Sequence, residues 1–231
     1  MLEVYSADNG QLMLQTDLLL DHEIELTKNK DDRDLFSMHS NFGNLSPQTH
    51  LAVWSDSQST LYSMSVDIGG DKDEKGELSF VPKATVLQKR TLTYKPADLI
   101  AAKQRATYKL VAWDQAAKQI HVYSHDRLEE EMVVLVDVKH PDELRLMQQT
   151  VGLLYYTKQE IGFFKLLKAP TAPDGKKEKP KSLEERIKTL KSKPVCFSNF
   201  YDIDQIVFDP VSAGTFIALS KKDNAIVLFQ A

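Results

Sequence analysis

Apolar and polar residues alternate in short runs along most of this chain, and clusters of Asp, Asn, Gly, Ser and Lys separate the runs. Because successive side chains of a strand point to opposite faces, this period of two predicts β-strands. The predicted strands are Leu2–Ser6, Gln11–Asp17, Leu35–Met38, His50–Ser55, Thr60–Val66, Glu77–Gln88, Thr107–Trp113, Gln119–Ser124, Glu131–Lys139, Glu143–Gln148, Thr150–Thr157, Glu160–Leu166, Pro194–Ser198, Ile203–Asp209, Thr215–Ser220 and Ala225–Gln230. The pattern therefore predicts an all-β protein.

Four stretches share one hairpin pattern, in which an apolar strand ends on a bulky residue, a polar turn follows, and an alternating strand returns. They are Leu51–Val66, Leu110–Ser124, Leu153–Leu166 and Phe216–Phe229. The step across the turn is seven residues from Trp54 to Leu61, from Trp113 to Ile120 and from Leu219 to Ile226, and five from Tyr156 to Ile161. Self-similarity at a fixed spacing indicates a repeat architecture.

The strands group in fours, which predicts one four-stranded antiparallel sheet in each repeat. The opening LEVYSAD (Leu2–Asp8) matches IHVYSHD (Ile120–Asp126), so the first copy begins on a later strand. Asn9-Gly10 predicts a tight hairpin there, since both residues tolerate positive φ. We expect two strands in the first copy, three complete copies, and three strands in the last.

Two polar insertions account for uneven repeat spacing. One is the charged loop Gly69–Gly76; the other is Lys168–Lys193, with nine Lys/Arg against four Asp/Glu, a charge of +5 that leaves −9 on the rest of the chain. We expect residues 168–193 to be a basic, partly disordered insertion. Ser182 and Glu185 form a capping box that predicts a short helix in its second half. Pro96–Arg105 is a second predicted helix.

The basic insertion holds the candidate partner-binding residues. A helical stripe of Leu183, Ile187 and Leu190 can contact a partner protein, while its cations can contact acidic protein or RNA phosphate. The full candidate set is Lys176, Lys177, Lys179, Lys181, Leu183, Arg186, Ile187, Lys188, Leu190 and Lys191.

Sheets of this kind, with strands ending in Trp-Asp or a substitute, resemble the WD-repeat β-propellers. The residues that carry the resemblance are Trp113-Asp114, Trp54-Ser55, Tyr156-Thr157 and Leu219-Ser220, with Val-Tyr-Ser endings at Val4–Ser6 and Val122–Ser124. The resemblance implies one propeller-like domain over residues 1–231, built from four-stranded antiparallel blades. The family's Gly-His pair before each blade is absent, which indicates a diverged propeller.

The two ends of the chain predict an incomplete ring. A propeller closes when strands from both termini share one blade, which removes open edges. Here the ends supply two and three strands, one more than a four-stranded blade needs. We therefore expect an incomplete propeller, or part of a larger one, that another polypeptide completes.

The overall composition limits which cellular compartments and which classes of partner we expect for this protein. The net charge is −4 and the pI is near 5.9, so the whole chain has no general attraction to nucleic acid or anionic membrane. A single cysteine, Cys196, excludes an internal disulfide. Apolar runs such as Met132–Val136 are too short to cross a membrane. With no signal peptide evident after Met1, we expect an intracellular protein, in the cytoplasm or nucleus, with no membrane insertion.

Motifs for catalysis or cofactors are lacking in the sequence. His121 and His125 are four residues apart on a predicted strand, a spacing that does not direct both to one metal ion. The Asp71–Gly76 segment lacks the glutamate that a calcium loop needs at its twelfth position, which is Pro82. Cys196 lies in an apolar run and is expected to be a buried small residue. Trp54 and Trp113 occupy equivalent strand ends, which favours repeat packing over a stacking platform for a ligand.

These observations favour a non-catalytic protein–protein interaction scaffold, without cofactor or metal, in a large multiprotein assembly. Its partners would be other protein subunits, one of which completes the propeller. Two alternatives stay open: an RNA-associated scaffold, for example in ribosome assembly, that uses the basic insertion, and a propeller enzyme with a site in its central channel.

Overall fold

The alternating segments of the sequence form antiparallel strands throughout the described part of the chain. The computed structural model describes residues 2–5, 12–16, 24–26, 33–40, 48–67, 70–72, 78–80, 83–104, 107–149, 152–164, 195–196, 202–208 and 215–230. Their elements are β1 (Leu2–Tyr5), β2 (Leu12–Thr16), β3 (Leu35–Ser40), β4 (Gln48–Ser55), β5 (Thr60–Asp67), β6 (Gly70–Lys72), β7 (Leu78–Phe80), β8 (Lys83–Thr91), β9 (Asp98–Gln104), β10 (Thr107–Asp114), β11 (Gln119–Ser124), β12 (Glu130–Leu135), the 3-10 helix η2 (Pro141–Glu143), β13 (Arg145–Gln149), β14 (Gly152–Tyr156), β15 (Glu160–Phe164), β16 (Val195–Cys196), β17 (Gln205–Phe208), β18 (Thr215–Ser220) and β19 (Ala225–Gln230).

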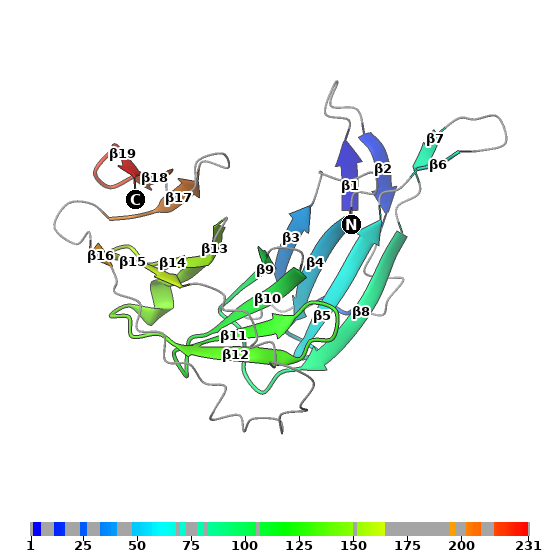
Figure 1. The fold of residues 1–231 in the computed structure, drawn as a ribbon, viewed down its shortest axis with the longest axis horizontal. Helices are drawn as coiled ribbons and strands as arrows, with labels where there is room; N and C mark the ends of the chain where they lie inside the picture. The colour runs from blue at the N-terminus through cyan, green and yellow to red at the C-terminus, as the bar shows by residue number, and fades with distance from the viewer. Residues whose placement is uncertain are drawn as a thin grey trace, which may run out of the picture. The chain divides into compact units, whose positions relative to one another are not determined.

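The strands form successive sheets in chain order (Figure 1). A two-stranded sheet, β1–β2, comes first, then three four-stranded sheets, β3–β4–β5–β8, β9–β12 and β13–β16, and last a three-stranded sheet, β17–β18–β19. The predicted numbers of strands, two, four, four, four and three, agree with these five sheets, although the four strands of the second complete sheet include β9, which was predicted as a helix. A sixth, two-stranded sheet, β6–β7, was not predicted. The fold is all-β, propeller-like and incomplete.

The predicted hairpin register is also confirmed. Trp54 pairs with Leu61, Trp113 with Ile120, and Leu219 with Ile226, while the shorter turn pairs Tyr156 with Ile161. The equivalent positions of the sheets can therefore be compared directly.

A capping side chain begins each of the four turns. Ser55, Asp114, Thr157 and Ser220 each accept a hydrogen bond from the backbone amide three residues later, at 3.4, 3.1, 3.1 and 3.3 Å. In the three longer turns the fourth residue, Ser59, Lys118 or Asn224, has a positive φ of 49°, 54° or 48°. A left-handed residue here turns the chain back into the second strand.

Gly70–Lys72, the described part of the charged insertion after β5, form a short strand. β6 pairs with β7, while β5 pairs directly with β8 and bypasses both. Within the predicted strand Glu77–Gln88 the structure describes two strands, β7 and the first part of β8.

The helix predicted at Pro96–Arg105 is wrong, since Asp98–Gln104 form β9 and pair with β10 over seven residues. Ala101 and Ala102 have high helix propensity, but both are buried in the sheet. Tertiary pairing and burial here outweigh local preference.

The chain divides into two compact units, Met1–Lys95 with His125–Leu128, and Pro96–Ser124 with Glu129–Ala231. In the first unit, one face of β3–β4–β5–β8 packs in a cluster of Ile24, Val53, Tyr62 and Met64. The segment His125–Leu128 is held against this sheet, because Ser63 donates to the His125 carbonyl and Arg90 donates to the Leu128 carbonyl at 2.8 Å.

Three sheets of the second unit pack face to face in chain order. The first cluster joins β9–β12 to β13 and β14, through Trp113 and Ile120 on one side and Leu146 and Tyr155 on the other. The second cluster joins β13–β15 to the last sheet and consists of Ile161, Ile203, Ile206 and Ala218 with Met147 and Tyr156 packed against them. Adjacent residues such as Tyr155 and Tyr156 thus serve opposite faces, as the strand period predicts.

Among the described residues, no helix has both the length and the hydropathy needed to span a bilayer.

Candidate protein-interaction surface

The last sheet, β17–β18–β19, has two different faces. Its inner face carries Ile206 and Ala218, which are 1% and 5% exposed and pack against β13–β15. Its outer face carries four aliphatic side chains that remain exposed: Val207 at 53%, Ile217 at 41%, Ile226 at 73% and Leu228 at 67%. We call these four residues the outer row.

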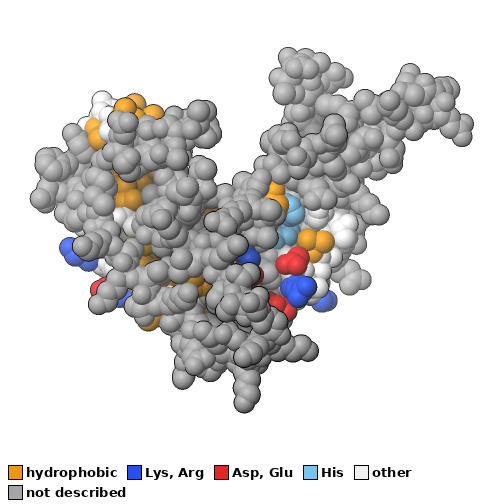
Figure 2. All heavy atoms as spheres, viewed as in Figure 1, with side chains coloured by type: hydrophobic (Ala, Val, Ile, Leu, Met, Phe, Trp, Pro, Cys, Tyr) orange, Lys and Arg blue, Asp and Glu red, His pale blue; other side chains and the backbone are white. Residues whose placement is uncertain are grey.

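The outer row runs across all three strands in one continuous register. Val207 of β17 pairs with Ile217 of β18, and Ile217 pairs with Leu228 of β19. Ile226 lies two residues before Leu228 and so faces the same side. In Figure 2, hydrophobic side chains gather at upper left, where Figure 1 places β17–β19.

The same positions are buried in an earlier sheet of the same unit. By register, Val207, Ile217, Ile226 and Leu228 correspond to Ile100, Val111, Ile120 and Val122 of β9–β12. Val111, Ile120 and Val122 are at most 1% exposed, and Ile100 packs against the cluster they form with Leu146 and Tyr155 of the following sheet. The outer row is thus a sheet-packing face that no sheet of the described residues covers.

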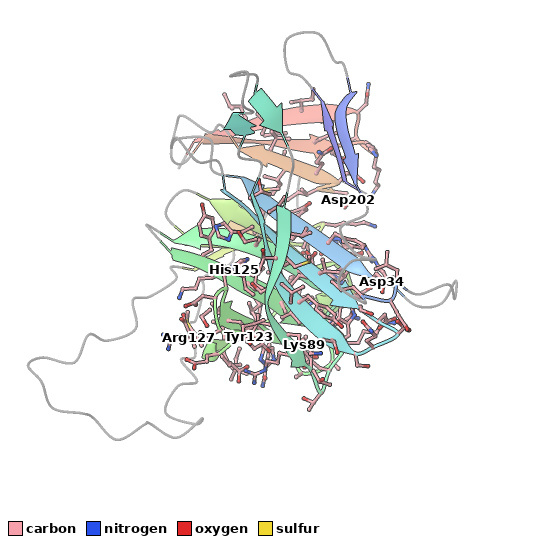
Figure 3. All side chains as sticks on the ribbon, turned by 90° about the vertical axis from the view of Figure 1, so that its right-hand side faces the viewer. Asp34, Lys89, Tyr123, His125, Arg127 and Asp202 are labelled. Atoms are coloured by element: carbon pink, nitrogen blue, oxygen red, sulfur yellow. The ribbon has the colours of Figure 1, made fainter. Side chains whose placement is uncertain are left out.

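The rim of the last sheet is held by a small polar network. Ser220 Oγ donates to Asp223 Oδ2 at 2.7 Å, and the Asp202 amide donates to the same carboxylate oxygen at 3.2 Å. The Ser220 hydroxyl, followed by that amide, holds the pKa of Asp223 below its usual value. Lys222 Nζ lies 2.9 Å from Asp202 Oδ2. Figure 3 labels Asp202 beside the last sheet. These bonds fix the turn that leads into β19 and so present the outer row on a defined scaffold.

The two histidines singled out in the sequence lie in different surroundings. His121 Nδ1 is 2.5 Å from Glu130 Oε1 across β11 and β12. His125 instead packs edge-on against His50, with ring centroids 4.4 Å apart. Burial, and secondly the neighbouring His50, lower the pKa of His125 to about 4. Within the described ranges no group of three or more His, Cys, Asp or Glu side chains is placed to hold a metal ion.

The tryptophans pack in the repeats, as the sequence favoured. Trp54 and Trp113 are both fully buried, and Trp113 Nε1 donates to the Pro141 carbonyl at 3.1 Å. Neither ring is available as a stacking platform for a ligand.

The candidate partner-binding residues all belong to the insertion Lys168–Lys193. All ten, from Lys176 to Lys191, lie outside the described residues, as does the predicted helix that contains Leu183. Cys196 is on β16, but its side chain is also outside the described set. Their predicted roles stay predictions.

The sequence reasoning did not single out the outer row, although a signal for it existed. The hairpin alignment that equates Trp113 with Leu219 also equates the buried Val111 and Val122 with Ile217 and Leu228. Aliphatic residues at the packing positions of the last described sheet are the signal that the sequence carries for this face.

No protein-family model matches the sequence, and no curated protein matches it. Among solved structures, the chain is similar to the WD40 domain of SCAP from fission yeast, with 11% sequence identity and a TM-score of 0.42. That match covers 71% of this chain and 37% of the other.

Proposed function

We propose that this protein is a non-catalytic interaction scaffold in a large intracellular assembly, and that it binds protein subunits through the outer row of β17–β19. The observation that carries this proposal is the contrast between equivalent positions. Val111, Ile120 and Val122 are buried by a neighbouring sheet, whereas Ile217, Ile226 and Leu228 are exposed.

Burial of the outer row would contribute favourable free energy to binding. Complete burial of an aliphatic side chain contributes about 1.5–3 kcal/mol, so covering these four, which are 41% to 73% exposed, would contribute roughly 3.5–7 kcal/mol. Contiguous apolar patches of this kind mark protein interaction sites, whereas single exposed apolar residues do not.

The test is affinity capture with the tagged full chain, followed by quantitative mass spectrometry. The double variant Ile226→Lys/Leu228→Lys should lose proteins that the wild type retains, because two charges would have to be desolvated in the interface. Leu135→Lys is the matched control, since Leu135 is also an exposed aliphatic residue, at 38%, but lies on β12. Equal capture by all three proteins would contradict the proposal.

An RNA-associated scaffold is the second candidate, favoured by the charge of +5 on Lys168–Lys193. Phosphate contacts release counterions, so such binding should weaken steeply with salt. Deletion of residues 168–193 should then abolish RNA retention while protein capture through the outer row persists. RNA retention that survives the deletion would exclude the basic segment as its cause.

A further inference from the structure

The last sheet ends one strand earlier than the sheets before it. In the three four-stranded sheets the third strand has a partner on both sides: β5 pairs with β4 and β8, β11 with β10 and β12, and β15 with β14 and β16. The third strand of the last sheet, β19, pairs with β18 and with no other strand of the described residues. Within the described part of the chain, β19 is therefore an open edge.

The sequence of β19 lacks the features that normally protect an edge. Soluble proteins block exposed edges with charged residues, proline or bulges. β19 reads AIVLFQ (Ala225–Gln230), without charge or proline, and pairs with β18 over six residues without a register shift. Alternate N–H and C=O groups of such a strand point away from its only neighbour and can accept another strand.

The two members of the outer row on β19 are its most exposed side chains. Ile226 and Leu228 are 73% and 67% exposed, against 53% for Val207 on β17 and 41% for Ile217 on β18. The least covered side chains are thus those that a fourth strand would flank.

We infer that an extended segment of a partner polypeptide adds antiparallel to β19 as the fourth strand of the last sheet. This inference rests on the proposed function and names the partner's chemistry. Main-chain hydrogen bonds would supply part of the affinity, and alternate side chains would supply specificity.

The earlier sheets of the second unit specify those side chains. Val134 of β12 lies opposite Ile120, and Val195 of β16 lies opposite Ile161. Both Ile120 and Ile161 correspond to Ile226. The core cluster that contains Ile120 also contains every second residue of one segment: Met132, Val134 and Val136. The partner segment therefore carries aliphatic residues at i, i+2 and i+4, with the central one opposite Ile226.

Strand number favours a single extended segment over the β1–β2 hairpin or a second copy of the chain. The β1–β2 hairpin of this chain would bring the last sheet to five strands, and an edge-to-edge second copy would bring it to six. No sheet of the described residues exceeds four strands. A single donated strand gives four, the number in each complete repeat.

The probe is a fluorescein-labelled peptide with the sequence of Glu129–Asp137, which contains the strand that fills this place on β11. Fluorescence anisotropy with the full chain should show saturable binding below about 1 mM, the weak limit of specific association. The double variant Ile226→Lys/Leu228→Lys should weaken the binding at least about tenfold, because the introduced lysine side chains would face the aliphatic row of the peptide. Leu135→Lys should leave binding unchanged.

Backbone N-methylation of the peptide distinguishes strand addition from contact with the face alone. Methyl groups on alternate residues remove the N–H groups that a ladder uses, so one alternate set should abolish binding and the other should be tolerated. Equal binding of the two N-methylated peptides would overturn the inference. Absence of binding by the unmethylated peptide would also overturn it. A defined dimer that protects the amides of β19 from exchange would also overturn it, in favour of a second copy.

These results are separable from the proposed function. If the outer-row variant loses captured proteins while the peptide does not bind, the scaffold proposal stands and strand addition fails. If capture is unaffected as well, both fail.

Discussion

Single residues in the hairpin turns adopt a conformation that their side chains do not favour. Ser59 and Lys118 have φ values of 49° and 54°, in the left-handed region, which costs a residue with a Cβ about 1–2 kcal/mol. Asn224, at the equivalent position, tolerates this region better. The turns are therefore slightly strained, and the hydrogen bonds between the two flanking strands hold them in this conformation.

Lys118→Gly should stabilise the protein. Glycine removes the left-handed cost but adds about 0.4–1 kcal/mol of unfolded-chain entropy, so the expected net gain is about 0.5–1 kcal/mol in the free energy of unfolding. Chemical denaturation measures this gain. Lys118→Ala is the control and should give no gain, because alanine keeps the Cβ; an equal gain from both would indicate an effect of charge.

Acid should destabilise the protein through His125. Its folded pKa of about 4 lies below the ordinary 6.5, mainly because of burial and then because of His50. The unfolded chain therefore takes up a proton first, and stability is full above pH 6.5 and falls as the pH drops toward 4. The loss attributable to this residue is at most about 3 kcal/mol.

Denaturation curves across this range measure the effect, with His125→Phe as the informative variant. The variant should have a shallower loss of stability between pH 6.5 and 4, although it is less stable overall. His140→Gln, which alters a half-exposed histidine, should keep the wild-type slope. An unchanged slope in His125→Phe would show that another group causes the acid sensitivity.

At the scale of elements, each sheet of the second unit uses alternate residues of the same strands to pack on two neighbours. Tyr155 and Leu146 face the β9–β12 sheet, while Tyr156 and Met147 face β17–β18. Asp98 adds a direct bond between sheets, because its Oδ2 accepts from the Leu146 amide at 2.7 Å. The order of the sheets along the chain is thus maintained by their side chains as well as by connectivity.

Gly162 shows how tight this packing is. A Cβ at this position would lie 2.0 Å from Cζ of Tyr155, its cross-strand partner. Because Tyr155 is buried, Gly162→Ala should displace the ring and cost about 1–3 kcal/mol.

A double-mutant cycle measures the coupling. In a Tyr155→Leu background the ring is gone, so Gly162→Ala should cost less than in the wild type. Equal costs in both backgrounds would place the strain elsewhere.

At the scale of the whole molecule, the last described sheet exposes a face and an edge of the kind that the preceding sheets of its unit cover. Such a surface has two consequences: specific binding when a partner is present, and weak self-association when the protein is alone.

The isolated chain should therefore associate without a defined size as its concentration rises. Ile226→Lys/Leu228→Lys should suppress this association in sedimentation velocity experiments while its Tm stays close to the wild-type value, because both side chains are exposed. A large decrease in Tm would instead show that these residues belong to the core. If the variant associates as much as the wild type, the chain self-associates through a surface other than the outer row.

Most of the strands and the hairpin registers follow from the sequence, because the period of two and the fixed step from Trp54 to Leu61 and from Trp113 to Ile120 are local properties. The sequence does not predict β9 (Asp98–Gln104), where pairing with β10 outweighs the helix preference of Ala101 and Ala102. Which apolar residues are covered depends on the tertiary structure: Val122 and Leu228 occupy equivalent positions with equivalent chemistry, but just one of them has a sheet packed on it. Burial depends on segments that are distant in the sequence, and the type of a residue does not indicate whether such a segment packs on it.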